Sequence, residues 1–489
     1  MALGKAFQDK CYYFSKGSDK NYEFLPFRFG RLNSKVLLTN EVGEYLILFP
    51  EEFNEFISKN LDQTSHTYSQ LKSKHFLIDK DSSVALELLA LKVRTKHAVI
   101  RNFTSLHIFV VTLRCDYSCP YCQVSRQSED KEQFDMSLAN AEKALEMTFR
   151  SPSPNIKIEF QGGESLLNFP LIQEIVYRAE VLNKLMGKNL QFVVATNLSF
   201  LNDDIIRFAE KHNFYFSTSL DGPEDIHNAN RPRPGKNGYQ LTINGIQKIQ
   251  DYLGPDKVSA LMTTTEASLS RVRDIIDEYV ERGFKSVFLR PLSPYGFAVK
   301  TNAIHKYDAE RWLDFYKEGL DYILKLNQQG IPILEQYTSI ILSKIFTPYG
   351  TGYVDLQSPA GAGISAIVFN YNGEVYATDE ARMLAEMGDK TFKLGNLNTN
   401  TYEDIFTSPP LLDALETSIT ESCPMCNDCV FQPYCGSDPV YHHATQGDFI
   451  GHKSKSGFCH KNMGIFKHIF TLLEENKEAR NIFNNWIYV

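Results

Sequence analysis

The chain of 489 residues is 43% hydrophobic and 22% charged, which is typical of a globular protein and excludes a largely disordered one. Its net charge of −8 argues against nucleic-acid binding, which requires a basic surface. At roughly 150 residues per domain, the length predicts about three domains.

The N-terminal sequence and the cysteine content indicate a cytoplasmic protein. Residues 1–14 show no secretory signal, and no apolar run reaches the ~18 residues that a membrane helix needs. In the reducing cytoplasm, nine cysteines favour metal binding over disulfides. Eight of them form two groups, and only Cys11 stands apart.

Residues 1–100 contain a hairpin pattern followed by helical segments. Residues 24–32 and 35–49 alternate as paired strands do, residues 51–61 and 67–74 have helical spacing, and residues 75–78 form a short apolar run. This order predicts a small winged-helix-like domain.

Residues 101–330 alternate between short apolar runs and segments of helical length. Strands are predicted at six places, and each is followed by a predicted helix: residues 106–113, 156–161, 191–196, 214–220, 257–264 and 285–292. Such repeats form a parallel sheet covered by helices, and right-handed crossovers curl it into a partial (β/α)6 barrel. The fold class is therefore α/β, with a site expected at the C-terminal ends of the strands.

Residues 331–489 are predicted to form a third, less regular domain. A hairpin over residues 366–382 turns at Asn372-Gly373, a favoured pair for two-residue turns. A cysteine-rich loop and a terminal helix near residues 462–476 follow.

The first cysteine group, Cys115-x3-Cys119-x2-Cys122, lies directly after the first predicted barrel strand. Three thiolates in one loop can hold three irons of a [4Fe–4S] cluster, whereas electron-transfer clusters take four cysteines. The open iron could then chelate S-adenosylmethionine (SAM), with Tyr121 as a packing surface for adenine. A structural zinc loop is the alternative, although it needs a fourth ligand.

This spacing, with an aromatic residue before the last cysteine, resembles the signature of the radical SAM superfamily. Gly162-Gly163-Glu164 resembles the motif that binds the SAM amino group in that superfamily. The resemblance also implies SAM contacts at later strand ends and at a following arginine: Thr196, Asn197, Ser217, Ser219, Asp221, Arg231 and Leu292. For Arg231, a solvated loop position is the alternative.

The second cysteine group resembles the SPASM domain, an auxiliary-cluster module of radical SAM enzymes that modify peptides. The ligands implied for one auxiliary [4Fe–4S] cluster are Cys426, Cys429, Cys435 and Cys459, and Cys423 is either a substitute ligand or a spare thiol. A second auxiliary cluster is not expected, because residues 375–379 lack the cysteine found there in the family. Zinc remains the alternative metal.

Asp379 stands in that same segment and has two interpretations. In the protein-oxidising relatives an aspartate at this place acts as a general base, which makes Asp379 the candidate catalytic residue. The alternative is a turn carboxylate that accepts backbone hydrogen bonds.

Residues 24–32, 37–46 and 376–384, together with the barrel motifs, are most similar to the His-Xaa-Ser system radical SAM maturases. The resemblance implies reductive cleavage of SAM to a 5′-deoxyadenosyl radical and oxidative crosslinking of a ribosomal precursor peptide bound by the N-terminal domain. It also implies an electron donor such as flavodoxin or ferredoxin and a partner maturase. The alternatives are a side-chain oxidase of the formylglycine-forming type and a non-catalytic iron–sulfur sensor or scaffold.

Overall fold

The computed structural model describes residues 22–79 and 84–488, which form two compact units. The first unit contains the described residues up to 97 together with residues 428–433, and the second contains residues 98–427 and the chain from 434 onward. Cys11 lies outside the described residues. No described helix has the length and apolar character that crossing a bilayer requires.

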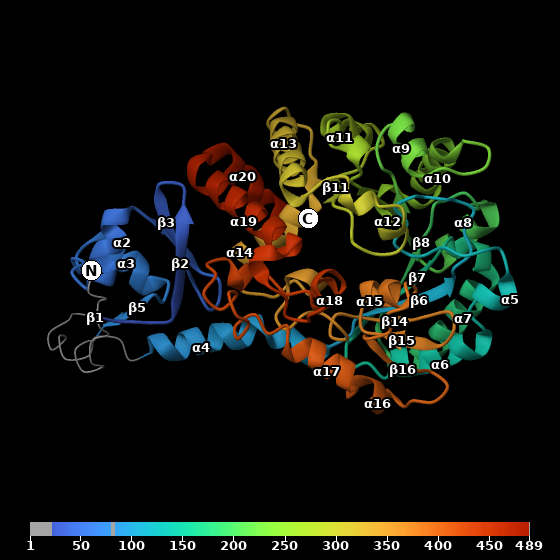
Figure 1. The fold of residues 1–489 in the computed structure, drawn as a ribbon, viewed down its shortest axis with the longest axis horizontal. Helices are drawn as coiled ribbons and strands as arrows, with labels where there is room; N and C mark the ends of the chain where they lie inside the picture. The colour runs from blue at the N-terminus through green and yellow to red at the C-terminus, as the bar shows by residue number, and fades with distance from the viewer. Residues whose placement is uncertain (1–21, 80–83, 489) are drawn as a thin grey trace, which may run out of the picture. The chain divides into compact units, whose positions relative to one another are not determined.

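The first unit is built on a small antiparallel sheet with the order β2-β3-β4 (Figure 1). A tight connection joins β2 to β3, and Asn33 adopts a positive φ of 53° there, which asparagine tolerates well. The core includes the fully buried Leu38, Phe56 and Leu71. The elements of this unit are β1 (Tyr22–Phe24), β2 (Phe27–Leu32), β3 (Lys35–Asn40), β4 (Tyr45–Leu48), α2 (Pro50–Ile57), α3 (His66–Ser73), β5 (Leu77–Asp79) and α4 (Ala85–Lys96).

Residues 428–433, from the second cysteine group, pack on this N-terminal sheet. Thr39 Oγ1 donates a hydrogen bond to the Val430 carbonyl at 2.7 Å, and Lys96 Nζ donates to the Pro433 carbonyl at 2.9 Å. The first unit therefore fixes the backbone on both sides of Phe431 and Gln432, a few residues beyond Cys429.

The second unit contains a nine-stranded sheet with the order β12-β10-β9-β8-β7-β6-β14-β15-β16. Strands β6 to β12 are parallel and adjacent in chain order, so the predicted partial barrel is confirmed. Strand β6 is buried on both faces, as in parallel sheets that helices cover. The strands are β6 (Leu106–Thr112), β7 (Asn155–Gly162), β8 (Asn189–Ala195), β9 (Tyr215–Ser219), β10 (Val258–Thr263), β12 (Leu289–Arg290), β14 (Ala366–Phe369), β15 (Glu374–Tyr376) and β16 (Lys393–Asn396).

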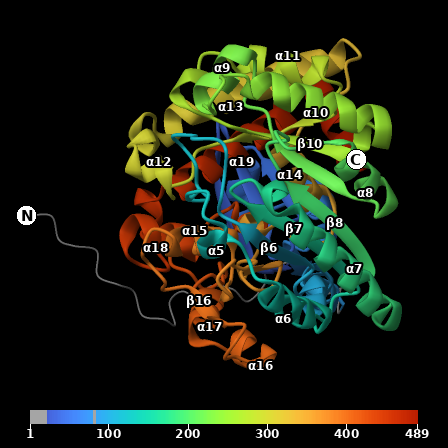
Figure 2. The same ribbon diagram turned by 90° about the vertical axis from the view of Figure 1, so that its right-hand side faces the viewer.

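Helices cover the outer face of this sheet, and Figure 2 shows α7, α8 and α10 outside β7, β8 and β10. Helix α13 packs on both α11 and α19, so the C-terminal helix belongs to the same body. The longer helices are α6 (Leu138–Phe149), α7 (Phe169–Met186), α8 (Asp203–Lys211), α10 (Gly238–Leu253), α11 (Val272–Glu281), α13 (Ala309–Gln328), α14 (Gln336–Phe346), α17 (Pro409–Glu416), α18 (Pro439–Gln446), α19 (Gly457–Glu475) and α20 (Lys477–Asn485). The shorter ones are α5 (Lys131–Phe134), α9 (Glu224–Asn230), α12 (Phe297–Lys300), α15 (Asp379–Ala385) and α16 (Tyr402–Phe406).

The sixth predicted strand, residues 285–292, is divided in two. β12 pairs with β10 in the barrel sheet, whereas β11 (Ser286–Val287) pairs with β13 (Leu334–Glu335) in a separate two-stranded sheet. The division leaves only a short strand at the barrel edge.

The hairpin predicted at Asn372-Gly373 forms between β14 and β15, with Gly373 at a φ of 82°. β14 also pairs in parallel with β6, so the hairpin extends the barrel sheet. Residues 331–489 were expected as a separate domain, but apart from residues 428–433 they pack with the barrel in one compact unit.

Candidate active site

The loop that carries the first cysteine group is held by backbone hydrogen bonds from distant segments. The Ser118 amide donates to the Pro232 carbonyl at 2.8 Å, and the Phe297 amide donates to the Cys122 carbonyl at 2.7 Å. The Cys122 amide donates to the Cys119 carbonyl at 3.2 Å. These bonds fix the loop at the C-terminal end of β6, where the sequence predicted it.

The three thiols open onto one cavity of about 230 Å³ at the strand ends. Most of the predicted cofactor-binding residues line the same cavity: Tyr121, Gly162, Gly163, Thr196, Asn197, Ser217, Ser219 and Arg231. Asp379 also lines it, although it comes from α15. Glu164, Asp221 and Leu292 do not lie on its wall.

Glycine at 163 is required by the close approach of two backbone segments. The Gly163 amide donates to the Thr112 carbonyl at 2.9 Å, and a Cβ at this position would lie 2.3 Å from the Arg114 carbonyl oxygen. The end of β7 therefore lies directly against the start of the cysteine loop, which brings the glycine backbone to the cavity wall.

Glu164 was expected to bind the SAM amino group, but its carboxylate is bonded inside the protein. It accepts hydrogen bonds from Thr196 Oγ1 at 2.6 Å, the Asn197 amide at 2.7 Å and the Leu166 amide at 3.0 Å. Burial raises the pKa of Glu164 to about 7, against the lowering effect of these bonds. In this structure Glu164 positions the end of β8.

Tyr121, Asp221 and Arg231 form a buried network beside Cys119. The Tyr121 hydroxyl donates to Asp221 at 2.5 Å and accepts from Arg231 at 2.8 Å. Arg231 Nε has no hydrogen-bond partner among the described residues. The solvated interpretation of Arg231 is therefore wrong, while Asp221 binds Tyr121 instead of facing the cavity.

Leu292 packs against Tyr121. The two residues share a small apolar cluster with Ala298. Leu292 lines a second, larger cavity and contributes to the support of the Tyr121 ring.

Asp379 pairs with a fully buried arginine. Arg382 Nε donates to Asp379 Oδ1 at 3.0 Å, and Arg382 also donates to the Val124 carbonyl at 3.2 Å, next to the cysteine loop. Asp379 therefore accepts from a side chain rather than from the backbone, and its carboxylate lies at the cavity.

The second cysteine group is divided between the two units. Cys429 belongs to the first unit, while Cys423, Cys426, Cys435 and Cys459 belong to the second. The Cys423 thiol donates to the Thr417 carbonyl at 3.1 Å, and burial raises its pKa.

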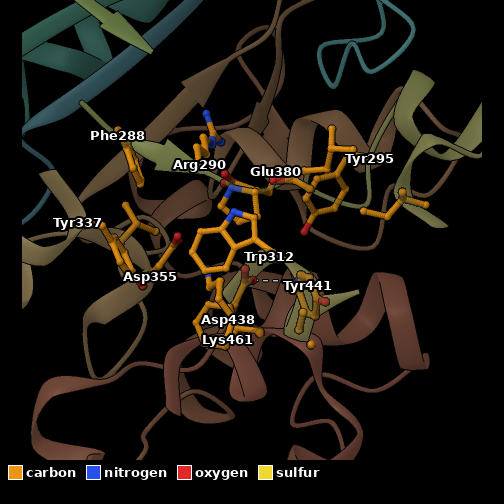
Figure 3. Close-up of a pocket in the computed structure, with 18 of the residues that line it drawn as sticks. Phe288, Arg290, Tyr295, Trp312, Tyr337, Asp355, Glu380, Asp438, Tyr441 and Lys461 are labelled. Carbon is orange, nitrogen blue, oxygen red and sulfur yellow. Dashed lines mark hydrogen bonds between the residues drawn. The ribbon is translucent and has the colours of Figure 1, made fainter. Parts of the chain in front are cut away.

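A second cavity of about 720 Å³ adjoins the first, and both are lined by Arg290 and Asp379. Figure 3 shows its aromatic and charged walls. The sequence did not predict that five charged residues from distant segments line this cavity: Arg290, Asp355, Glu380, Asp438 and Lys461. The position of Glu380 beside Asp379 was the single signal available.

The first cavity fits an iron–sulfur cluster better than a zinc ion. Among the described residues, no three Cys, His, Asp or Glu side chains are arranged to hold one metal ion, as a zinc site requires. A cluster binds its cysteines through separate irons. Burial raises the pKa of the Cys119 thiol to about 11, so a metal must displace that proton on binding.

Three cysteines with a partly open cavity at the strand ends of a partial barrel define an enzyme that uses an iron–sulfur cluster and SAM. Residues 109–279 match the family model described as "Radical SAM superfamily". Residues 109–279 therefore form a radical SAM domain, and the cofactors of that domain are a [4Fe–4S] cluster and SAM.

Sequence similarity to known proteins extends beyond residues 109–279. A cysteine-type anaerobic sulfatase-maturating enzyme of Clostridium novyi is 24% identical over 378 residues, or 73% of this chain and 93% of that protein. An uncharacterized protein of Methanocaldococcus jannaschii is 29% identical over 188 residues, and the match covers 38% of this chain and 62% of that protein.

Solved structures show the same fold at lower identity. The enzyme anSMEcpe with bound AdoMet and Kp18Cys peptide has a TM-score of 0.63 at 17% identity, covering 78% of this chain and 99% of that one. SuiB of Streptococcus suis bound to precursor peptide SuiA has a TM-score of 0.50 at 14% identity, covering 87% of this chain and 97% of that one.

Proposed function

We propose that this radical SAM enzyme oxidatively modifies, and crosslinks, a ribosomally made precursor peptide. The observation that carries the proposal is the shared wall of the two cavities, since Arg290 and Asp379 line both. A substrate side chain in the larger cavity would therefore reach the cavity that holds the three thiols.

When bound, the cluster and SAM would supply the radical chemistry that removes a hydrogen atom from the substrate. Cys115, Cys119 and Cys122 would hold the cluster. The backbone at Gly162 and Gly163, together with Thr196, Asn197, Ser217, Ser219 and Arg231, would hold SAM. The Tyr121–Asp221–Arg231 network would hold the cysteine loop in a fixed position relative to the SAM-binding residues.

Asp379 is the residue that we assign to proton removal. It lies on the shared wall, and its carboxylate is held by a hydrogen bond from Arg382. A general base must stand within reach of the reacting atom, and Asp379 is the carboxylate that lines both cavities.

The auxiliary cluster and the N-terminal unit complete the proposal. Cys426, Cys429, Cys435 and Cys459 would hold one auxiliary [4Fe–4S] cluster that accepts the electron from the substrate. Cys423 would be a spare thiol, since it is buried while the other four are partly exposed. The precursor would add a strand to β2 or β4, the two edges of the N-terminal sheet. A flavodoxin- or ferredoxin-like donor and a partner maturase would act with the enzyme.

A side-chain oxidase is the second candidate. It is favoured by the match to a sulfatase-maturating enzyme over 93% of that protein, and Asp379 would serve the same role in it. A non-catalytic sensor is disfavoured, because the thiols and the predicted SAM-binding residues share a cavity.

Co-expression with the precursor peptide encoded nearby, followed by mass spectrometry, tests the proposal. We expect a product lighter by two hydrogens whose fragmentation stops between two linked residues. The same mass change with fragmentation across every bond would indicate an aldehyde and the second candidate. An unchanged peptide, with active enzyme, would contradict both.

A further inference from the structure

The larger cavity holds three carboxylates that form no ion pair within the described part of the chain. Asp355, Glu380 and Asp438 line it and come from three separate segments. No Lys, Arg or His nitrogen of the described residues lies within 4.0 Å of their carboxylate oxygens, the distance that defines an ion pair. Figure 3 shows them around Trp312.

These carboxylates disfavour one another's ionisation. Burial raises the pKa of Glu380, and the neighbouring Asp355, Asp379 and Asp438 raise it further. Burial and Asp355 likewise raise the pKa of Asp438. Uncompensated negative charge in a buried site is costly, and a bound cation would offset it.

Two cations of the protein line the same cavity without neutralising the carboxylates. Arg290 forms no ion pair within the described chain, and Lys461 instead lies 5.4 Å from the Tyr337 ring centroid and 5.2 Å from that of Phe458. Neither cation forms an ion pair with the three carboxylates, so a cation that enters the cavity would favour their ionised forms. The residues at the cavity's exposed side, such as Lys306, Asp308 and Arg311, have both signs.

A buried hydroxyl points to a missing ligand independently of these charges. Tyr295 is 1% exposed and lines the cavity, and its hydroxyl has no hydrogen-bond partner among the described residues. Its pKa is raised by burial and by Asp438, Glu380 and Asp355. Buried hydroxyls normally have a partner, so this one lacks a group that enters the cavity.

The geometry favours an organic cation over a metal ion. No three Asp, Glu, His or Cys side chains of the described residues are arranged to ligate one metal. The cavity of about 720 Å³ also has aromatic walls, among them Trp312, Tyr337 and Tyr441. Carboxylates combined with aromatic faces bind ammonium and guanidinium groups well.

We propose that the larger cavity selects a cationic side chain of the substrate, a lysine- or arginine-like residue, through Asp355, Glu380 and Asp438. The inference rests on the proposed peptide-modifying function and names its substrate class. The aromatic rings would contact the aliphatic stem and the cationic end, while the Tyr295 hydroxyl would bond to the bound residue.

Equilibrium dialysis on the reconstituted holoenzyme with saturating SAM tests the inference. The probes are Nα-acetyl-lysine methylamide and its neutral analogue Nα-acetyl-norleucine methylamide. We expect the lysine probe to bind at least about tenfold more tightly, the difference that one well-placed charge pair gives in a buried site. Equal binding of the two probes would overturn the inference.

Substitutions in the cavity test whether its carboxylates cause the preference for the lysine probe. Glu380→Gln and Asp438→Asn conserve shape, and Asn also caps helix α18 as Asp438 does. Each should reduce the preference for the lysine probe at least about threefold. Asp314→Asn, on the exposed side of α13, is the matched control and should leave the preference unchanged. An equal loss in the control, or no loss in the two cavity variants, would contradict the assignment.

This measurement separates the inference from the proposed function, because probe binding needs no SAM cleavage. If the lysine preference is found but the peptide is not modified, the proposed function fails and the cation site remains. If the peptide is modified while the probes bind equally, the cation site fails alone.

Discussion

Tyr121 joins the cysteine loop to the interior of the barrel through its hydroxyl. It donates to Asp221 and accepts from Arg231, and all three groups are removed from bulk water. The same ring packs on Leu292, so one residue couples the loop to two strand ends. This explains how a loop with six residues between its outer cysteines, and without a helix or strand, keeps a fixed shape.

Tyr121→Phe should therefore destabilise the protein although the ring is conserved. Asp221 would keep only weaker partners such as the Thr263 amide at 3.3 Å, and a buried carboxylate that loses a donor costs about 1–3 kcal/mol. The free energy of unfolding in denaturant measures the loss. Tyr117→Phe is the control, because its hydroxyl bond of 3.3 Å to the Gly238 carbonyl is long and should contribute less. Equal losses would contradict this role of Tyr121.

Asp379→Asn separates proton removal from SAM cleavage. The amide keeps the shape of the side chain but cannot act as a base, and general-base catalysis contributes about 10²–10⁴-fold. We expect modified peptide to form at least about 10²-fold more slowly, while 5′-deoxyadenosine still appears. Liquid chromatography of both products measures the two rates, and a normal rate of peptide modification would show that Asp379 is a structural residue.

At the scale of elements, the β14–β15 hairpin depends on a buried carboxylate. Glu374 on β15 accepts bonds from Lys390 at 2.8 Å, Lys393 at 2.7 Å and the Tyr376 hydroxyl at 2.7 Å. Burial alone raises its pKa, but these bonds outweigh burial and lower the pKa of Glu374 to about 2. The bonds thus hold the hairpin and the strand β16 together.

The lowered pKa fixes the sign of a pH effect. Ionised Glu374 stabilises the folded protein fully at pH values above its unfolded pKa of about 4.3. This stabilisation is lost as the pH falls through the folded pKa of about 2. Glu374→Gln should lower the free energy of unfolding at pH 7 by about 1–2 kcal/mol, allowing for the solvent around the two lysines. Denaturation at pH 7 and at pH 3 measures this, and a constant difference between variant and parent would contradict it.

The sequence predicted those parts of the site that follow strands. Cys115, Gly163, Thr196 and Ser219 each lie at or shortly after the C-terminal end of a parallel strand, and such ends meet at one edge. The strand pattern does not decide which way a polar side chain turns. Glu164 therefore looked like a ligand, although its carboxylate is bonded to the end of β8.

The larger cavity could not be predicted because its residues are brought together by packing. Asp355, Glu380, Asp438 and Lys461 lie on different segments, and the pairing of β14 with β6 and the packing of α19 on α13 place them together. Neither contact has a local sequence signal.

At the scale of the molecule, the cysteines of the second group are divided between the two compact units. Cys429 belongs to the N-terminal unit and the other cysteines of the group to the barrel unit.

Iron content tests the number of clusters. The reconstituted chain should bind about eight irons, as two [4Fe–4S] clusters do, and Cys435→Ser should reduce this to about four. Cys423→Ser should retain about eight, since Cys423 is buried while the four proposed ligands are partly exposed. Colorimetric iron and sulfide determination gives the counts, and about twelve irons in the parent chain would contradict a single auxiliary cluster.

The transfer of a substrate hydrogen to the SAM-derived product tests the central claim most directly. Precursor peptide made with deuterated residues is incubated anaerobically with reduced holoenzyme and SAM, and the 5′-deoxyadenosine is analysed by mass spectrometry. We expect 5′-deoxyadenosine that carries one deuterium, in an amount proportional to the amount of modified peptide. Unlabelled 5′-deoxyadenosine beside an unmodified, fully deuterated peptide would contradict it.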